Sequence, residues 1–291
     1  MDFTFKTYQK LIEILKKQDF SFQRIDNFIE NPNKKSILLR HDVDNLPENS
    51  LTFAKIENKL GIRGTYYFRI VPESWDEIII KQIAAMGHEV GYHYEDISFA
   101  VTRLNIKINK QKLQIPELEK ELANLAIHSF EKNLECLRKI TKVKTICMHG
   151  NPISRWDSRS LWKYHDYHNF GIIGEPYFDV NFNEVLYLTD TGRRWNGSNF
   201  NIRDKVYNDK VQIENTKNAK FRNTPSLPTS YSFHSTFDII KAAEEGLLPD
   251  TIMMTFHPQR WTNHPLPWIK ELIWQNTKNV AKFLLIKFRN N

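Results

Sequence analysis

Two acidic residues follow the apolar run at residues 36–39. Asp42 and Asp44 stand two positions apart, behind Arg40 and His41. Residues two apart in an extended chain point to the same side, so the two carboxylates are expected to face one pocket and to share a metal ion or a water there. The alternative is a solvated acidic turn, but such turns usually contain Gly, Asn or Pro. We therefore expect Asp42 and Asp44 to form one wall of a site.

A histidine ends the glycine-containing run at residues 87–93. His93 stands in a cluster with His88, Glu89, Tyr94, Glu95 and Asp96. A neutral imidazole is a natural partner for a divalent cation that carboxylates also hold. We expect His93 to bind a metal ion. His88 precedes the strand and is expected to make a structural hydrogen bond instead.

Two more histidines end apolar runs. His149 follows residues 145–148, His257 follows residues 251–256, and a proline comes within three residues of each. The carboxyl ends of parallel strands meet at one edge of a sheet, so both histidines are expected at a shared rim. An unperturbed imidazole titrates at roughly 6.5, so either could act as a general acid.

A further group of residues could hold a substrate. Arg193 and Arg194 stand between Asp190 and Trp195. Arginine suits a carboxylate or a phosphate, and the face of an indole suits a sugar ring or a cation. The alternative is a surface ion pair with a packing tryptophan. The candidate substrate-binding residues are Arg40, Tyr67, Glu95, Arg193, Arg194, Trp195 and Arg260.

The segments between these motifs alternate between strand and helix patterns. The expected strands are at 36–39, 64–69, 89–93, 145–148 and 251–256, with short ones at 185–189 and near 211. The expected helices are at 8–17, 50–60, 75–86, 116–141 and 268–288. Such alternation is typical of βαβ units in a parallel sheet, whose reactive residues lie at the carboxyl ends of the strands.

The composition and the absence of several motifs exclude other functions. The net charge of +7 is spread over scattered lysines, so no nucleic-acid partner is expected. The sequence has no GxGxxG, P-loop, GxSxG or HExxH motif, which disfavours nucleotide hydrolysis and serine esterase chemistry. Cys136 and Cys147 fit neither a disulfide framework nor a metal knuckle, and we expect both to be small core residues.

We expect a single domain over residues 1–291. It would have an N-terminal helical cap at 1–33 and an irregular, aromatic-rich insertion at 155–235. The N-terminus lacks a signal pattern, and no apolar run approaches the roughly 18 residues of a membrane span, so a cytoplasmic protein without a transmembrane segment is expected. The oligomeric state stays open.

The order of these motifs resembles the NodB-type polysaccharide deacetylases, particularly the branch that acts in the biosynthesis of bacterial surface glycans such as O-antigen. The resemblance rests on the segments 40–44, 64–68 and 87–93 and on His257, which occur in the family's order. The Asp-x-Asp form is similar to that of the aminoarabinose-lipid deformylases. The resemblance implies an α/β fold, a distorted (β/α)7 barrel, with a divalent cation, often zinc, held by one Asp and two His.

The resemblance also implies roles for single residues. Asp42 would be the base, Asp44 and His93 metal ligands, and His257 the acid that protonates the leaving amine. The roles of Asp42 and Asp44 could be exchanged, because the family usually has its two Asp adjacent. The family's second metal-binding His falls at Ile97. We expect His149 to supply the missing ligand, with Glu95 as the alternative.

The activity that the resemblance implies is metal-dependent removal of an N-acetyl or similar acyl group from a sugar in a cell-surface polysaccharide precursor. The partner would be a sugar or glycolipid substrate, with peripheral contact to a lipid-linked form. Ile97 and the high aromatic content favour an alternative. It is a catalytically inactive or metal-independent deacetylase-like protein that binds glycan or glycolipid intermediates.

Overall fold

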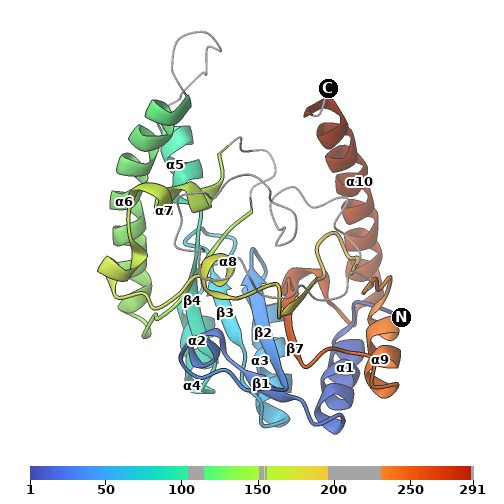
Figure 1. Cartoon of the computed structure of the whole chain (residues 1–291). Helices are drawn as coiled ribbons and strands as arrows, with labels where there is room; N and C mark the ends of the chain where they lie inside the picture. The colour runs from blue at the N-terminus through green and yellow to red at the C-terminus, as the bar shows by residue number, and fades with distance from the viewer. Residues whose placement is uncertain (104–114, 151–153, 155, 196–230, 290–291) are drawn as a thin grey trace.

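The computed structural model of the chain is built on one all-parallel β-sheet (Figure 1). It describes residues 1–103, 115–150, 154, 156–195 and 231–289. Its strands are β1 (Ser21–Gln23), β2 (Ser36–Val43), β3 (Thr65–Phe68), β4 (Glu89–Tyr94), β5 (Ile146–Met148), β6 (Leu186–Thr189) and β7 (Thr251–Phe256). Six of them follow the order β5-β4-β3-β2-β7-β6, and β1 pairs with the first half of β2. The result is a curled half-barrel with β2 near its middle.

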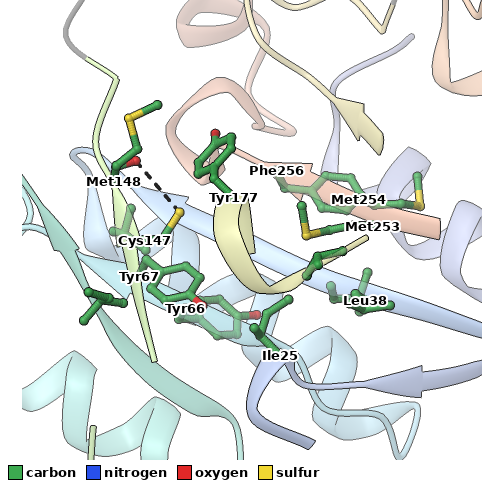
Figure 2. Close-up of a cluster of buried hydrophobic side chains, with 14 of the residues drawn as sticks. Ile25, Leu38, Tyr66, Tyr67, Cys147, Met148, Tyr177, Met253, Met254 and Phe256 are labelled. Atoms are coloured by element: carbon green, nitrogen blue, oxygen red, sulfur yellow. Dashed lines mark hydrogen bonds between the residues drawn. The ribbon is translucent and has the colours of Figure 1, made fainter. Parts of the chain in front are cut away.

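The strands are buried on both faces, as parallel strands covered by helices must be. Every residue of β2 is buried, and so is every residue of β3 and β4. Figure 2 shows buried side chains of β2, β3 and β7; by register Leu38 and Met253 lie on one face of the sheet, and Tyr66 and Phe256 lie on the other. The apolar sequence runs therefore become strands because both of their faces lose water.

Helices cover the sheet and connect its strands. They are α1 (Phe5–Lys17), α2 (Ile25–Glu30), α3 (Pro47–Lys59), α4 (Glu77–Ala85), α5 (Asp96–Arg103), α6 (Ile115–Arg138), α7 (Leu161–Tyr164), α8 (Pro176–Asp179), α9 (Thr236–Glu244) and α10 (Pro265–Arg289). Short 3-10 helices lie at Ser158–Ser160, Tyr167–Phe170 and Pro258–Arg260. Thr4, Asp76 and Ser235 cap the starts of α1, α4 and α9 through side-chain hydrogen bonds.

The predicted alternation of strands and helices is confirmed, and each predicted element within the described residues is present. Strand β2 is longer than the apolar run at 36–39 predicts. It extends to Val43 through charged residues that are buried as well. The N-terminal segment is not helical throughout, since it contributes β1 to the sheet. The strand expected near 211 lies outside the described residues.

None of the helices in the described part of the chain is both long enough and apolar enough to cross a membrane.

A buried carboxyl group joins α5 and α6 to β4. Asp96 accepts hydrogen bonds from the Tyr92 hydroxyl at 2.7 Å, the Ser129 hydroxyl at 2.9 Å and the Asn133 amide at 2.9 Å. Burial raises the pKa of Asp96 to about 6, against these hydrogen bonds, which lower it. The folded state therefore binds a proton at Asp96 more tightly than the unfolded state does.

This shift gives a pH dependence of stability. Because the folded pKa is raised, the contribution of Asp96 is complete below the unfolded value of 3.8 and is lost as the pH rises to about 6. The loss is roughly 3 kcal/mol at 1.36 kcal/mol per pKa unit. We expect Asp96→Asn to gain about that much unfolding free energy relative to wild type between pH 4 and pH 7, measured by urea titration. Parallel curves for the two proteins would contradict the assignment.

Candidate functional site

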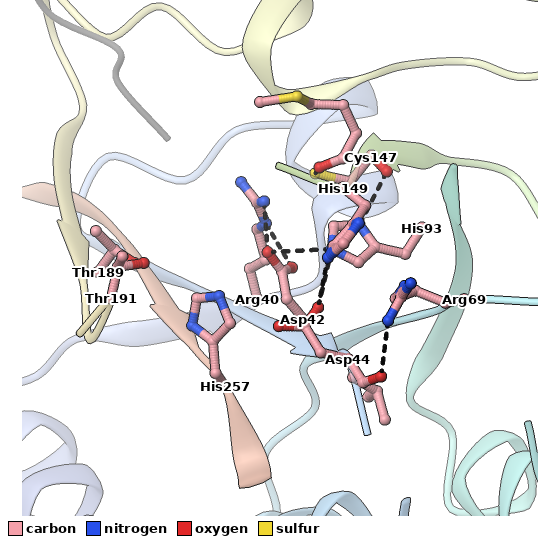
Figure 3. Close-up of polar contacts among 12 residues, drawn as sticks. Arg40, Asp42, Asp44, Arg69, His93, Cys147, His149, Thr189, Thr191 and His257 are labelled. Carbon is pink, nitrogen blue, oxygen red and sulfur yellow. Dashed lines mark hydrogen bonds and ion pairs between the residues drawn. The ribbon is translucent and has the colours of Figure 1, made fainter. Parts of the chain in front are cut away.

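The polar residues singled out in the sequence converge at the carboxyl edge of the sheet (Figure 3). Asp42 and Asp44 end β2, and His93 lies near the end of β4. His149 directly follows β5, and its N–H donates to the Tyr94 carbonyl beside it. His257 directly follows β7. Parallel pairing aligns these ends, so residues far apart in the sequence share one rim.

Alternation along β2 decides which side chains enter the site. Arg40, Asp42 and Asp44 point to one side, as residues two apart in an extended strand do (Figure 3). His41 points to the other side, where its Nε2 lies 2.9 Å from Glu57 Oε1. Consecutive polar residues of one strand thus serve different faces of the sheet.

Arg40 and Asp42 form a bidentate ion pair inside the protein. Arg40 Nε donates to Asp42 Oδ1 at 2.8 Å, and Arg40 Nη2 donates to Asp42 Oδ2 at 2.7 Å. Both residues are buried, and Nη2 also lies 3.3 Å from the Tyr177 hydroxyl. Burial lowers the pKa of Arg40, but Asp42, Cys147, Tyr177 and Tyr187 together raise it by more, so the pKa lies well above its usual value. Arg40 is therefore positioned to orient the Asp42 carboxylate.

Asp44 carries an oxygen with no hydrogen-bond donor. Its Oδ2 accepts from the Gln259 amide at 2.9 Å, but the buried Oδ1 has no hydrogen-bond partner. Oδ1 lies 3.6 Å from His93 Nε2 and 3.5 Å from His149 Nε2. Burial raises the pKa of Asp44, but His149, His257 and His93 lower it more, so it stays ionised.

Both of these histidines are oriented through their other ring nitrogen. His93 Nδ1 lies 3.0 Å from the Cys147 carbonyl oxygen, and His149 Nδ1 lies 3.1 Å from Glu95 Oε2. Each Nδ1–H can donate there, which leaves the Nε2 lone pair facing Asp44. Burial lowers the pKa of His93 to about 4, so this imidazole is neutral at pH 7. Metal-binding histidines are commonly oriented by such second hydrogen bonds.

Two spacings in this donor set suit a divalent cation. Ligand atoms about 2.0–2.1 Å from a tetrahedral zinc ion lie about 3.3 Å apart, close to the spacings from Asp44 Oδ1 to the Nε2 atoms of His93 and His149. A cation beside the unpaired Asp44 Oδ1 would stabilise it. In the described part of the chain, the group whose ligand atoms all lie within 4.8 Å of one another is Asp42, His93 and Cys147. The two groups share His93.

His257 is held from behind by a buried aspartate. Its Nδ1 lies 2.6 Å from Asp190 Oδ1, and its backbone N–H donates to Asp190 Oδ2 at 3.0 Å. Asp190 also accepts from Trp261 Nε1 at 2.6 Å and from Arg260 Nη1 at 2.9 Å. Burial raises the pKa of Asp190, but His257 and Arg260 lower it more, so Asp190 is an anion. The Nδ1 proton is fixed, and Nε2 stays available for proton transfer.

Four candidate substrate-binding residues have partners within the protein. Arg260 binds Asp190 as just described, and Glu95 accepts from Arg69 Nε at 2.6 Å as well as contacting His149. The Tyr67 hydroxyl lies 2.9 Å from the Thr145 hydroxyl, and the Tyr67 ring packs against the bare Cα of Gly91. Arg40 is bound to Asp42. These contacts hold the four side chains in place, and their substrate-binding roles stay predictions.

The Arg193–Trp195 segment makes packing contacts. Arg193 Nη1 donates to the Trp268 carbonyl at 2.8 Å, and its guanidinium stacks over the Trp268 and Phe3 rings. Trp195 Nε1 donates to Thr236 Oγ1 at 3.0 Å, and Arg194 is half-buried. The substrate-binding roles of these three residues stay predictions.

Three neighbours of the site were not predicted from the sequence. Asp190 ends the short strand β6 much as Asp42 lies at the end of β2, so the same strand-end rule could have found it. Cys147 looked like a core residue and is buried, but its Sγ joins Asp42 and His93. Gln259 had no signal, because only the turn after β7 brings it to Asp44. Ile97 is buried in the apolar core and offers no ligand atom.

A metal-binding prediction follows from the shared histidine. We expect His93→Ala to abolish stoichiometric binding of Zn²⁺ or Co²⁺, because His93 belongs to both groups. Asp44→Asn and Cys147→Ser then tell which of the two groups holds the ion. Loss of a residue that only hydrogen-bonds a ligand typically lowers metal affinity roughly 10- to 100-fold. The variant that lacks a true ligand should lose more metal affinity than that. Cys136→Ser, a half-buried position in α6, is the control. Unchanged metal content in His93→Ala would refute both groups.

A stability prediction follows from Asp190. Asp190→Asn should cost about 3–5 kcal/mol of unfolding free energy, because it leaves the buried Arg260 guanidinium without its counter-charge. The matched change Glu245→Gln, in the exposed Lys241–Glu245 pair, should cost less than about 1 kcal/mol. Equal losses in the two variants, measured by denaturant unfolding, would show that Asp190 is not an essential anion.

Comparisons with known proteins returned nothing: no protein-family model matches this chain, and neither does any curated protein or solved structure.

Proposed function

We propose that this chain is a metal-dependent hydrolase of the polysaccharide deacetylase type. Its reaction would remove an N-acetyl or similar acyl group from a sugar in a cell-surface polysaccharide precursor. The observation that carries this proposal is the unpaired Asp44 Oδ1 facing the Nε2 atoms of His93 and His149. The curled parallel sheet is compatible with the distorted (β/α)7 barrel that the family resemblance implies.

The proposed ligands are Asp44, His93 and His149, with zinc as the proposed ion. His149 would supply the ligand that the family's second metal-binding histidine provides, because this chain has Ile97 at that position. A divalent cation bound there supplies Lewis acidity toward the amide carbonyl of the substrate. Asp42, His93 and Cys147 form the competing ligand group, and His93 Nε2 lies 3.7 Å from Asp42 Oδ2.

The other residues would move protons. Asp42, oriented by Arg40, accepts a proton from the water that attacks the acyl carbonyl. His257 gives a proton from Nε2 to the departing sugar nitrogen, while Asp190 retains the Nδ1 proton and stabilises the charged ring. The C–N bond breaks as the new C–O bond forms, and the products are the free amine and the carboxylate. The two proton-transfer groups lie on different strands of the same rim.

Asp44→Asn tests the function. With a metal-loaded protein and N-acetylglucosamine oligomers as the probe, we expect acetate release to fall at least about a hundredfold, because the variant loses a charged ligand. The matched control is Asp19→Asn, an exposed position with φ of 59° that Asn tolerates. Release is measured as free acetate and as new primary amine.

Two outcomes would overturn the proposal. Full turnover by Asp44→Asn would exclude the assigned site. Tight binding of the oligomers by the wild-type chain, with no acetate released from them or from a panel of other N-acyl sugars, would favour the glycan-binding alternative.

A further inference from the structure

Helix α10 exposes several large apolar residues and buries two polar ones. Leu266, Ile269, Ile273 and Val280 are between 47% and 72% exposed. At 100° per residue these four positions fall within one narrow stripe of the helix. The buried residues Gln275 and Asn279 lie on the opposite side of α10. This is the reverse of the usual pattern of a surface helix.

Polar contacts hold the inner side of α10 on the body of the protein. The Asn279 amide donates to the Gly192 carbonyl at 3.0 Å. Near the start of α10, Trp268 Nε1 donates to the Asp2 carbonyl at 2.7 Å, and the Trp268 carbonyl accepts from Arg193. The outward direction of the apolar stripe is therefore fixed by specific hydrogen bonds. Covering such a stripe gains about 25 cal/mol per Å² of apolar surface removed from water.

Charge indicates what could cover the stripe. Lys270 is exposed at the edge of the stripe, and the half-exposed ring of Trp274 follows it around the helix. Lys278 is exposed beyond Trp274, and its ammonium lies 4.8 Å from the centre of that ring. In sequence, the basic residues of α10 are Lys270, Lys278, Lys282, Lys287 and Arg289, against Glu271 as the acidic residue. A basic helix with an Ile, Leu and Trp face suits an anionic lipid surface. A second copy would bring like charges together.

The position of α10 relates this surface to the site. The helix begins shortly after the carboxyl end of β7 and runs away from the sheet on the side where the strands end (Figure 1). That edge also carries Asp42, Asp44 and His93 (Figure 3). A surface that covered the stripe would therefore lie beside the rim of the site.

We propose that α10 docks on an anionic membrane surface, with its apolar stripe among the lipid chains and Lys270 and Lys278 at the phosphate groups. The docking stands on the exposure and charge of α10 alone. Its consequence for the site, that the sugar substrate is carried on a lipid, rests on the proposed function.

The full-length chain is tested by co-sedimentation with vesicles. The vesicles contain phosphatidylcholine alone or mixed equally with phosphatidylglycerol. We expect binding to the mixed vesicles, and at least about a tenfold loss of affinity in the double variant Ile269→Glu, Ile273→Glu, equal to 1.4 kcal/mol. The control pair Ile78→Glu, Leu247→Glu changes equally exposed residues elsewhere and should bind like wild type. Thermal unfolding checks that each variant folds.

The charge is tested separately. Lys270→Gln with Lys278→Gln should weaken binding to the mixed vesicles and reduce its dependence on salt. Three results would overturn the proposal: no binding to mixed vesicles, equal binding by wild type and the Ile269, Ile273 variant, or a wild-type dimer in sedimentation velocity that this variant dissociates.

The same variant separates the two proposals. It should keep wild-type acetate release on water-soluble N-acetylglucosamine oligomers, because Ile269 and Ile273 are not among the residues of the site. Vesicle binding without acetate release in the wild type would refute the proposed function and leave the docking intact. Acetate release without vesicle binding would refute the docking and leave the proposed function intact.

Discussion

Strand β2 carries polar side chains on both faces and lies near the middle of the sheet, where neither face meets water. A charge in such a place is stable only when a counter-charge and hydrogen bonds surround it. On one face the guanidinium of Arg40 pairs with Asp42. On the other face His41 lies between the Glu57 carboxylate and the Thr65 carbonyl. The rest of the site is arranged around a strand whose charged and polar groups pair within the protein.

Several of the polar groups below the rim have close partners. Glu57 Oε1 accepts from the Tyr8 hydroxyl at 2.5 Å and lies 2.9 Å from His41 Nε2. At the rim, Asp44 Oδ1 is a buried carboxylate oxygen without a hydrogen-bond partner, and the Nε2 atoms of His93 and His149 lie next to it. The cost of keeping such an oxygen buried is the physical reason to expect a cation at this point.

Much of the fold could be predicted from the sequence because parallel strands are apolar throughout and glycines mark several helix ends. The predictions of β2, β4, β5 and β7 needed no long-range information. Short elements such as β1 and α2 were missed because their stability comes from neighbours: β1 exists by pairing with β2. A three-residue strand has no periodicity to detect.

The candidate site was predictable for the residues that end strands and less so for their partners. His93 and His257 follow from a general rule about parallel sheets, whereas the partner of His257 is Asp190, 67 positions away. The arginines at 193 and 194 have side chains suited to a substrate. The stacking of Arg193 between Phe3 and Trp268 depends on tertiary contacts that no local pattern reveals.

Asp190 also holds the turn that follows β7. Its carboxylate accepts hydrogen bonds from His257, Arg260 and Trp261, so a single side chain clamps the whole bend that leads from β7 toward α10. The same two carboxylate oxygens hold the His257 ring and the turn at residues 257–261. Loss of the Asp190 charge would therefore disturb the imidazole and this turn together.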